Sequence, residues 1–105
     1  MEKKFKHFLI KESEHMIQIQ FLFSVVTPEI EQEINGFLTT LYFGVRTNIS
    51  LDLKEVRYLD LKTTSYLMGL GRELSLSKRK LIITNPPLSL TRFLKTLEIN
   101  KFVSL

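Results

Sequence analysis

The spacing of apolar residues changes along this chain, and that change limits the fold more than any other feature. In the run 16–23, apolar residues alternate with Gln18 and Gln20, which is the period of two of a strand with one buried face. The next run has apolar residues at helical spacing, namely Ile30, Ile34, Phe37, Leu38 and Leu41. They form a single stripe, as on a helix that faces a core. A strand followed by such a helix predicts a layered α/β domain.

The two ends of this helix are also marked in the sequence. Thr27 has the side chain of an N-cap, Pro28 suits the first helical position, and Glu29 lies near the positive end of the helix dipole. Gly44 is a suitable C-terminal stop. We therefore expect the helix to extend from Pro28 to about Gly44.

Strand-like and helix-like runs continue on both sides of this helix. Two apolar runs, 5–10 and 16–23, are joined by the polar residues 11–15 and predict a hairpin. Downstream we expect a strand at 49–53, a helix at 63–75 and a strand at 81–84 that is buried on both faces. A third helix is expected to start at Leu88 or Ser89, and its buried residues are Leu90, Phe93, Leu94 and Leu97. The tail at 101–105 is expected to add a strand or to cover the sheet. This order predicts one α/β domain over residues 1–105. Its mixed sheet has four to five strands, with helices packed against it.

Composition excludes several classes of protein. The chain has 105 residues, 44% of them apolar, which suffices for one domain with its own core. It contains no cysteine, which excludes disulfides and cysteine-based metal sites and favours a cytoplasmic location. No apolar run approaches the roughly 20 residues of a membrane span, and the basic N-terminus leads into no secretory signal.

The net charge of +4 is distributed unevenly. Residues 1–43 contain four Lys and six Glu, whereas residues 44–105 contain eleven Lys or Arg and five acidic residues. Within residues 44–105 only Lys78, Arg79 and Lys80 are contiguous, and aromatic residues do not alternate with the basic ones as in a base-stacking surface. We interpret the basic half as a solvated face, and we do not expect nucleic acid as a partner.

A longer pattern lies in the middle of the chain. Residues 49–53 read Ile-Ser-Leu-Asp-Leu, Val56 follows, and Tyr58-Leu59-Asp60 leads into a segment that contains Leu67 and Leu70. With the flanking runs 80–86 and 94–102, this order resembles the STAS domain, the module of anti-sigma-factor antagonists. The resemblance covers nearly the whole chain and implies a STAS-like fold.

In the STAS family, the turn after the second Asp binds a protein partner, and this chain departs from the family at that turn. The family has a Ser that accepts phosphate and then Ser or Thr and Gly, whereas here Asp60 is followed by Leu61, Lys62 and Thr63. Leu61 has no hydroxyl, so the usual phosphate switch is lost. The partner-binding residues that the resemblance implies are Asp60, Leu61, Lys62, Thr63, Thr64 and Tyr66. Thr63, Thr64 and Ser65 are alternative phosphate acceptors, although capping of the helix also explains them.

The function that this resemblance implies is that of a non-enzymatic protein-interaction module. It would act like an anti-sigma-factor antagonist and regulate transcription by binding an anti-sigma factor or kinase. An alternative is a scaffolding or self-associating STAS protein in a larger complex, either a stressosome-like or a lipid-transport assembly, and a homodimer is open as well. No cofactor is expected.

The titratable side chains give no sign of a catalytic or metal site. Asp52 and Asp60 are the only aspartates, and their places at the ends of a strand and a loop favour capping of backbone amides over acid–base catalysis. His7 and His15 flank the first hairpin, and we interpret both as surface residues without metal.

Two further features, one within the expected helix at 63–75 and one just before it, are open to more than one interpretation. Gly69 and Gly71 weaken it, and they mark either close packing on the sheet or a surface that a partner approaches. Leu61 either forms an exposed docking patch with Tyr66 and Met68 or folds inward.

Overall fold

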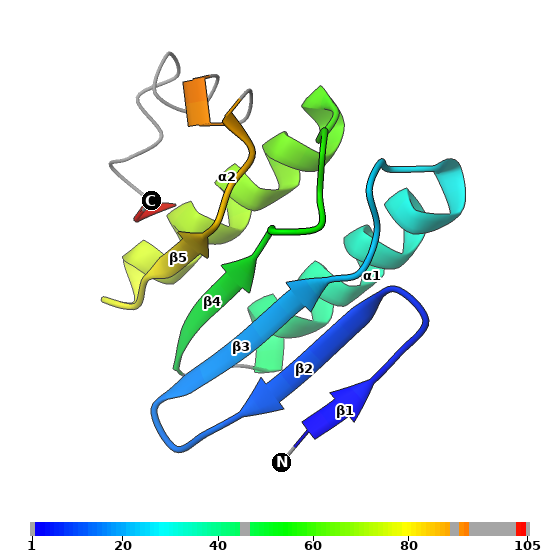
Figure 1. Ribbon diagram of the computed structural model, residues 1–105. Helices are drawn as coiled ribbons and strands as arrows, with labels where there is room; N and C mark the ends of the chain where they lie inside the picture. The colour runs from blue at the N-terminus through cyan, green and yellow to red at the C-terminus, as the bar shows by residue number, and fades with distance from the viewer. Residues whose placement is uncertain (1, 45–46, 89–90, 93–102, 105) are drawn as a thin grey trace.

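The computed structural model describes residues 2–44, 47–88, 91–92 and 103–104. These residues form a six-stranded sheet and two long helices. Figure 1 shows how they are arranged. The elements in chain order are β1 (Glu2–Lys4), β2 (Phe8–Glu12), β3 (Met16–Phe21), α1 (Pro28–Gly44), β4 (Asn48–Asp52), α2 (Leu61–Leu76), β5 (Leu81–Thr84) and β6 (Val103–Ser104).

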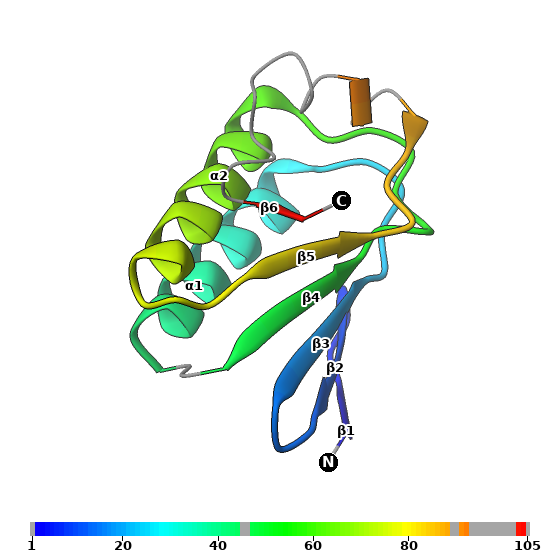
Figure 2. The ribbon, with the colours of Figure 1, turned by 90° about the vertical axis from the view of Figure 1, so that its left-hand side faces the viewer.

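The order of the strands in the sheet is their order in the chain. β1, β2 and β3 pair in antiparallel fashion, and β3, β4, β5 and β6 pair in parallel. A parallel pair needs a crossover connection, and α1 and α2 provide those between β3 and β4 and between β4 and β5. Both helices lie on the same face of the sheet and contact each other (Figure 2), so neither covers the opposite face, which we call the uncovered face of the described residues.

The core lies between the helices and the covered face of the sheet. Alternate strand residues point into it, because successive side chains of a strand face opposite sides. The largest fully buried side chains are Ile19, Phe21, Ile34, Ile49, Leu51, Leu53, Leu67, Leu74, Leu81 and Ile83. Phenyl rings fill one end, where Phe8 stacks on Phe37 at a centroid distance of 5.1 Å. The pattern of burial therefore follows the periods of two and 3.6 in the sequence.

Helix α1 has the predicted boundaries. The Thr27 Oγ1 accepts a hydrogen bond from the Ile30 amide at 3.2 Å, as an N-cap does, and Pro28 is the first helical residue. The helix ends at Gly44, as expected.

Helix α2 begins two residues earlier than we predicted. Asp60 is its N-cap, and the Asp60 Oδ1 accepts a hydrogen bond from the Thr63 amide at 3.0 Å. A capping side chain bonds the amide of the second or third helical residue, so Leu61 and Lys62 belong to the first turn. The expected start at Thr63 is therefore wrong, whereas the interpretation of Asp60 as a cap is confirmed.

The α/β class and the mixed sheet with packed helices are confirmed, but two details of the sheet are corrected. The described part of the chain contains six strands rather than four to five, because Glu2–Lys4 also pairs with β2. β5 is not buried on both faces: Leu81 and Ile83 are buried, whereas Ile82 and Thr84 are only half-buried. The physical reason is that α1 and α2 cover a single face.

The expected C-terminal elements are described only in part. Leu88, Thr91 and Arg92 are helical, and the Thr91 amide donates to the Pro87 carbonyl at 3.0 Å. The rest of the predicted third helix lies outside the described residues. Val103–Ser104 pairs with β5, so the expectation that the tail adds a strand is confirmed. Neither α1 nor α2, the two long helices of the described residues, has the length and apolarity needed to cross a membrane.

Candidate functional site

Two loops meet at the end of the sheet toward which the parallel strands point (Figure 1). One follows β3 and the other follows β4. The Ser24 carbonyl in the first loop accepts hydrogen bonds from the Arg57 amide at 2.9 Å and from the Tyr58 amide at 3.3 Å in the second. Val56 and Leu59 are buried and anchor the second loop in the core. The two loops therefore form one connected surface of fixed backbone.

Three large apolar side chains on this surface remain exposed to solvent. Val25 is 51% exposed, Tyr58 is 58% exposed and Leu61, at the start of α2, is 67% exposed. We call these three residues the loop patch. Exposed apolar side chains that gather on joined loops are typical of surfaces that bind other proteins. The exposure of Leu61 also decides between the two alternatives for this residue, because its side chain does not fold inward.

Thr63 and Thr64 are not part of this surface. Their exposed fractions are 0% and 1%, so both side chains point into the protein. The Thr64 hydroxyl donates to the Asp60 carbonyl at 2.8 Å, whereas the buried Thr63 hydroxyl has no hydrogen-bond partner within the described residues. Their implied role in partner binding stays a prediction, and their burial argues against direct contact with a partner. Ser65 is exposed, and its hydroxyl donates to the Leu61 carbonyl at 2.9 Å.

Lys62 is exposed but its charge is paired. The Lys62 Nζ lies 2.7 Å from the Glu31 Oε1 on α1. The hydrogen bond to Glu31 and the attraction of its negative charge raise the pKa of Lys62 above its ordinary value. The positive charge beside Leu61 therefore has an acidic partner on α1.

The remaining residues of the helix that we considered for docking are less exposed than Leu61. Tyr66 and Met68 are half-buried and pack against the core cluster, so they do not extend the loop patch as a fully exposed row. Gly71 is buried in α2. Gly69 is exposed, and a Cβ at this position would meet nothing within 4 Å. Close packing therefore does not explain Gly69.

The two aspartates have the structural roles that we predicted. Asp60 caps α2, and the Asp52 Oδ1 accepts hydrogen bonds from the Lys54 amide at 3.0 Å and from the Asn85 Nδ2 at 3.2 Å. Asn85 follows β5 in a left-handed conformation with φ of 52°, which Asn tolerates better than most residues. Asp52 thus ties the end of β4 to the end of β5.

The interpretation of the histidines is half right. His15 is exposed, as expected. The prediction that His7 is a surface residue is wrong, because its side chain is only 14% exposed and its Nδ1 lies 2.6 Å from the Glu33 Oε2 on α1. Over the described ranges, no three His, Cys, Asp or Glu side chains are grouped so that they could hold a metal ion.

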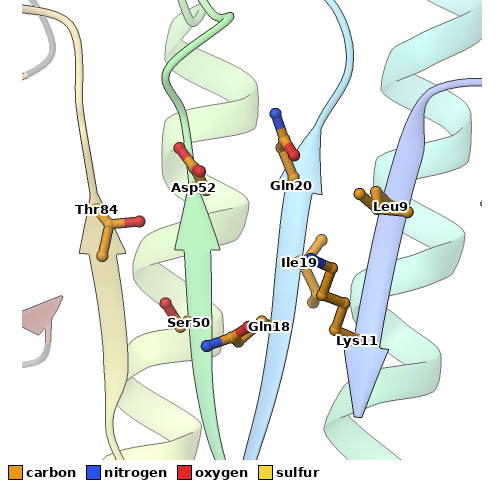
Figure 3. Close-up of a pocket in the computed structure, with 8 residues that line it drawn as sticks. All are labelled: Leu9, Lys11, Gln18, Ile19, Gln20, Ser50, Asp52 and Thr84. Carbon is orange, nitrogen blue, oxygen red and sulfur yellow. The ribbon is translucent and has the colours of Figure 1, made fainter. Parts of the chain in front are cut away.

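The uncovered face of the sheet contains a shallow polar hollow of about 220 Å³. Figure 3 shows its side chains in front of the strands, with the helices behind them. They come from four neighbouring strands and include Leu9, Lys11, Gln18, Gln20, Ser50, Asp52 and Thr84. The alternation of Gln18 and Gln20 with apolar residues indicated this polar face in advance, but not that Ser50 and Asp52 would lie beside them.

Comparisons with known proteins agree with this architecture. A comparison of the sequence with protein-family models finds no match, and a comparison with curated proteins finds none either. Several solved structures are similar, among them two forms of SpoIIAA. The anti-sigma factor antagonist SpoIIAA in its unphosphorylated form matches with a TM-score of 0.71 and 20% identity, over 84% of this chain and 81% of that chain. The Bacillus cell fate determinant SpoIIAA in its phosphorylated form matches with a TM-score of 0.74 and 18% identity, over 91% of this chain and 87% of that chain.

Identities of this size establish the fold and leave the function to be argued from the surface of this chain. The predicted STAS resemblance is confirmed at the level of the fold. The chain therefore has the SpoIIAA-like α/β fold of STAS domains.

Proposed function

We propose that this protein is a non-enzymatic interaction module that binds an anti-sigma factor of the kinase type through the loop patch, and that it regulates transcription in this way. The observation that carries the proposal is the exposure of Val25 and Tyr58, on two loops that are hydrogen-bonded to each other, and of Leu61 at the adjoining start of α2. A solved structure of the same fold is that of an anti-sigma factor antagonist, which supports a protein as the partner.

The composition of the loop patch suits a protein partner. Tyrosine is enriched among residues that contribute most to binding energy, and the other two exposed side chains of the loop patch, Val25 and Leu61, are aliphatic. Because Glu31 pairs with Lys62, the patch has no strong unpaired charge at Leu61 that would demand an acidic partner surface. We therefore expect the partner to present an apolar surface to Leu61.

We further propose that phosphate does not control this contact at the usual turn. By resemblance, Leu61 occupies the place of the family's phosphate acceptor, and it has no hydroxyl. Thr63 and Thr64 are buried, so a kinase could reach their hydroxyl groups only after local unfolding of α2. Ser65 is the exposed serine of this turn. Binding would then be controlled by the amount of the protein or by its partner.

The test is a titration of the purified protein with candidate kinase-type anti-sigma factors, in which calorimetry measures the affinity. We expect Leu61→Ala to weaken binding about tenfold, which corresponds to ~1.4 kcal/mol. Leu76→Ala is the matched control, because Leu76 is 74% exposed at the opposite end of the same helix. Equal affinities of the two variants would exclude the loop patch as the binding surface.

A second set of measurements tests the loss of the phosphate switch and distinguishes the proposed antagonist from the scaffolding alternative. Incubation with the bound kinase and ATP, followed by mass spectrometry, should find no phosphate on residues 60–65. Phosphate at Ser65 would contradict the loss of the switch. Recovery of an ATPase or of a homo-oligomer in a pulldown, with no kinase-type partner, would favour the scaffolding alternative over the proposed antagonist.

A further inference from the structure

A second hollow lies between the loop that joins β1 to β2 and helix α1. Its volume is about 470 Å³, within the range of pockets that hold small molecules. It is lined by Phe5, Lys6, His7, Phe8, Gln32, Glu33, Gly36 and Phe37. None of these residues belongs to the loop patch, so we call the site the aromatic hollow and consider it independently of the proposed function.

Hydrogen bonds hold the loop side of the aromatic hollow in place. The Phe5 amide donates to the Phe8 carbonyl at 2.7 Å, and the Leu22 amide donates to the His7 carbonyl at 2.9 Å. The half-buried contact between the His7 Nδ1 and the Glu33 Oε2, at 2.6 Å, ties this loop to α1. The hollow is therefore formed before any ligand arrives, which lowers the entropic cost of binding.

Three phenyl rings give the aromatic hollow its apolar lining. Phe8 is buried and stacks on the half-buried Phe37 with an interplanar angle of 16°. Phe5, on the loop, is 49% exposed. Flat aromatic rings pack against such a lining in stacked or edge-to-face geometry.

Gly36 supplies a second and separate indication of a ligand. It lies in the middle of α1, where glycine weakens a helix relative to alanine. A Cβ at this position would meet nothing within 4 Å, so close packing against described residues does not require glycine there. Gly36 instead lines the aromatic hollow, and a side chain at position 36 would reduce the space inside it.

We propose that the aromatic hollow binds a small, flat aromatic molecule that carries a hydrogen-bond donor. The phenyl rings contact the faces and edges of the ligand, and the Glu33 carboxylate accepts the hydrogen bond. A fatty acid would also suit an apolar lining, but its ionised carboxylate has no donor for Glu33. The Nζ of Lys6, the lysine of the lining, already lies 3.5 Å from the Glu29 Oε1.

The test uses indole, which is flat and carries one N–H donor, in an NMR titration of the ¹⁵N-labelled full chain. We expect saturable shifts confined to the amides of residues 5–8 and 32–37, with a Kd on the order of 1 mM for a molecule of this size. Gly36→Leu should weaken binding at least tenfold, because the new side chain occupies the hollow.

Gly69→Leu is the matched control, because Gly69 is also a helical glycine whose Cβ would meet open space, and it does not line the hollow. Both variants should fold, since leucine favours a helix more than glycine does. Equal binding of indole by the two variants, or shifts away from the two segments, would overturn the site. Tighter binding of hexanoate than of indole would overturn the class of ligand.

Discussion

The two faces of the sheet are built from the same strands, yet they have opposite chemistry. In β4, Leu51 is fully buried under the helices, whereas its neighbours Ser50 and Asp52 point to the uncovered face. In β3, Ile19 is buried between Gln18 and Gln20 in the same way. The position of the two helices, rather than the strands themselves, therefore determines which face of the sheet buries the apolar side chains that stabilise the protein.

The largest expected effect is on the covered face. Leu51→Ala should lower the free energy of unfolding by about 2–5 kcal/mol, because it removes buried methyl groups and leaves a cavity. Ser50→Ala, one residue away on the other face, should change it by less than about 0.5 kcal/mol. Urea unfolding followed by circular dichroism measures both. Similar losses for the two variants would mean that the uncovered face is covered in solution.

The second-largest effect on the free energy of unfolding is expected at the start of α2. Asp60→Ala should cost about 1 kcal/mol, because the Thr63 amide loses its capping acceptor. Asp60→Asn should cost much less, because Asn is an equally good N-cap. A large loss in both variants would indicate that the charge of Asp60, and not the cap, stabilises the helix.

The smallest effects on stability are expected for two adjacent buried threonines of α2, and substitution of the two should have opposite effects. Thr63→Val should stabilise the protein by up to about 1 kcal/mol, because the buried hydroxyl that it removes has no partner among the described residues. Thr64→Val should destabilise by about 1 kcal/mol, because it removes the hydrogen bond to the Asp60 carbonyl. Thermal unfolding of both variants checks this. A loss of stability in Thr63→Val would show that its hydroxyl has a partner in solution.

The features that the sequence predicted are those that local interactions determine. Thr27 and Pro28 start α1 with groups that lie within one turn, and Asp60 caps α2 in the same way. The period of two in β3 likewise needs no knowledge of distant residues. These signals sufficed for the fold class and for both boundaries of α1 and β5.

The features that the sequence did not predict depend on contacts between distant segments. β1 consists of three exposed charged residues, and only its register with β2, such as Lys3 beside Ile10, makes it a strand. The joining of the two loops rests on the Ser24 carbonyl, which no periodicity marks. At the candidate site, the family resemblance located Leu61, but its exposure and the burial of Thr63 follow from how α2 rests on the sheet.

The agreement between strand order and chain order has a consequence for how the protein is made. No strand has to insert between two strands that are already paired, because each one joins the edge left by its predecessor. A domain generally folds as a unit, and the ribosome synthesises its segments from the N-terminus onward. Each strand that leaves the ribosome therefore finds its neighbour in the sheet already synthesised, and no strand pairing has to be undone to complete the sheet.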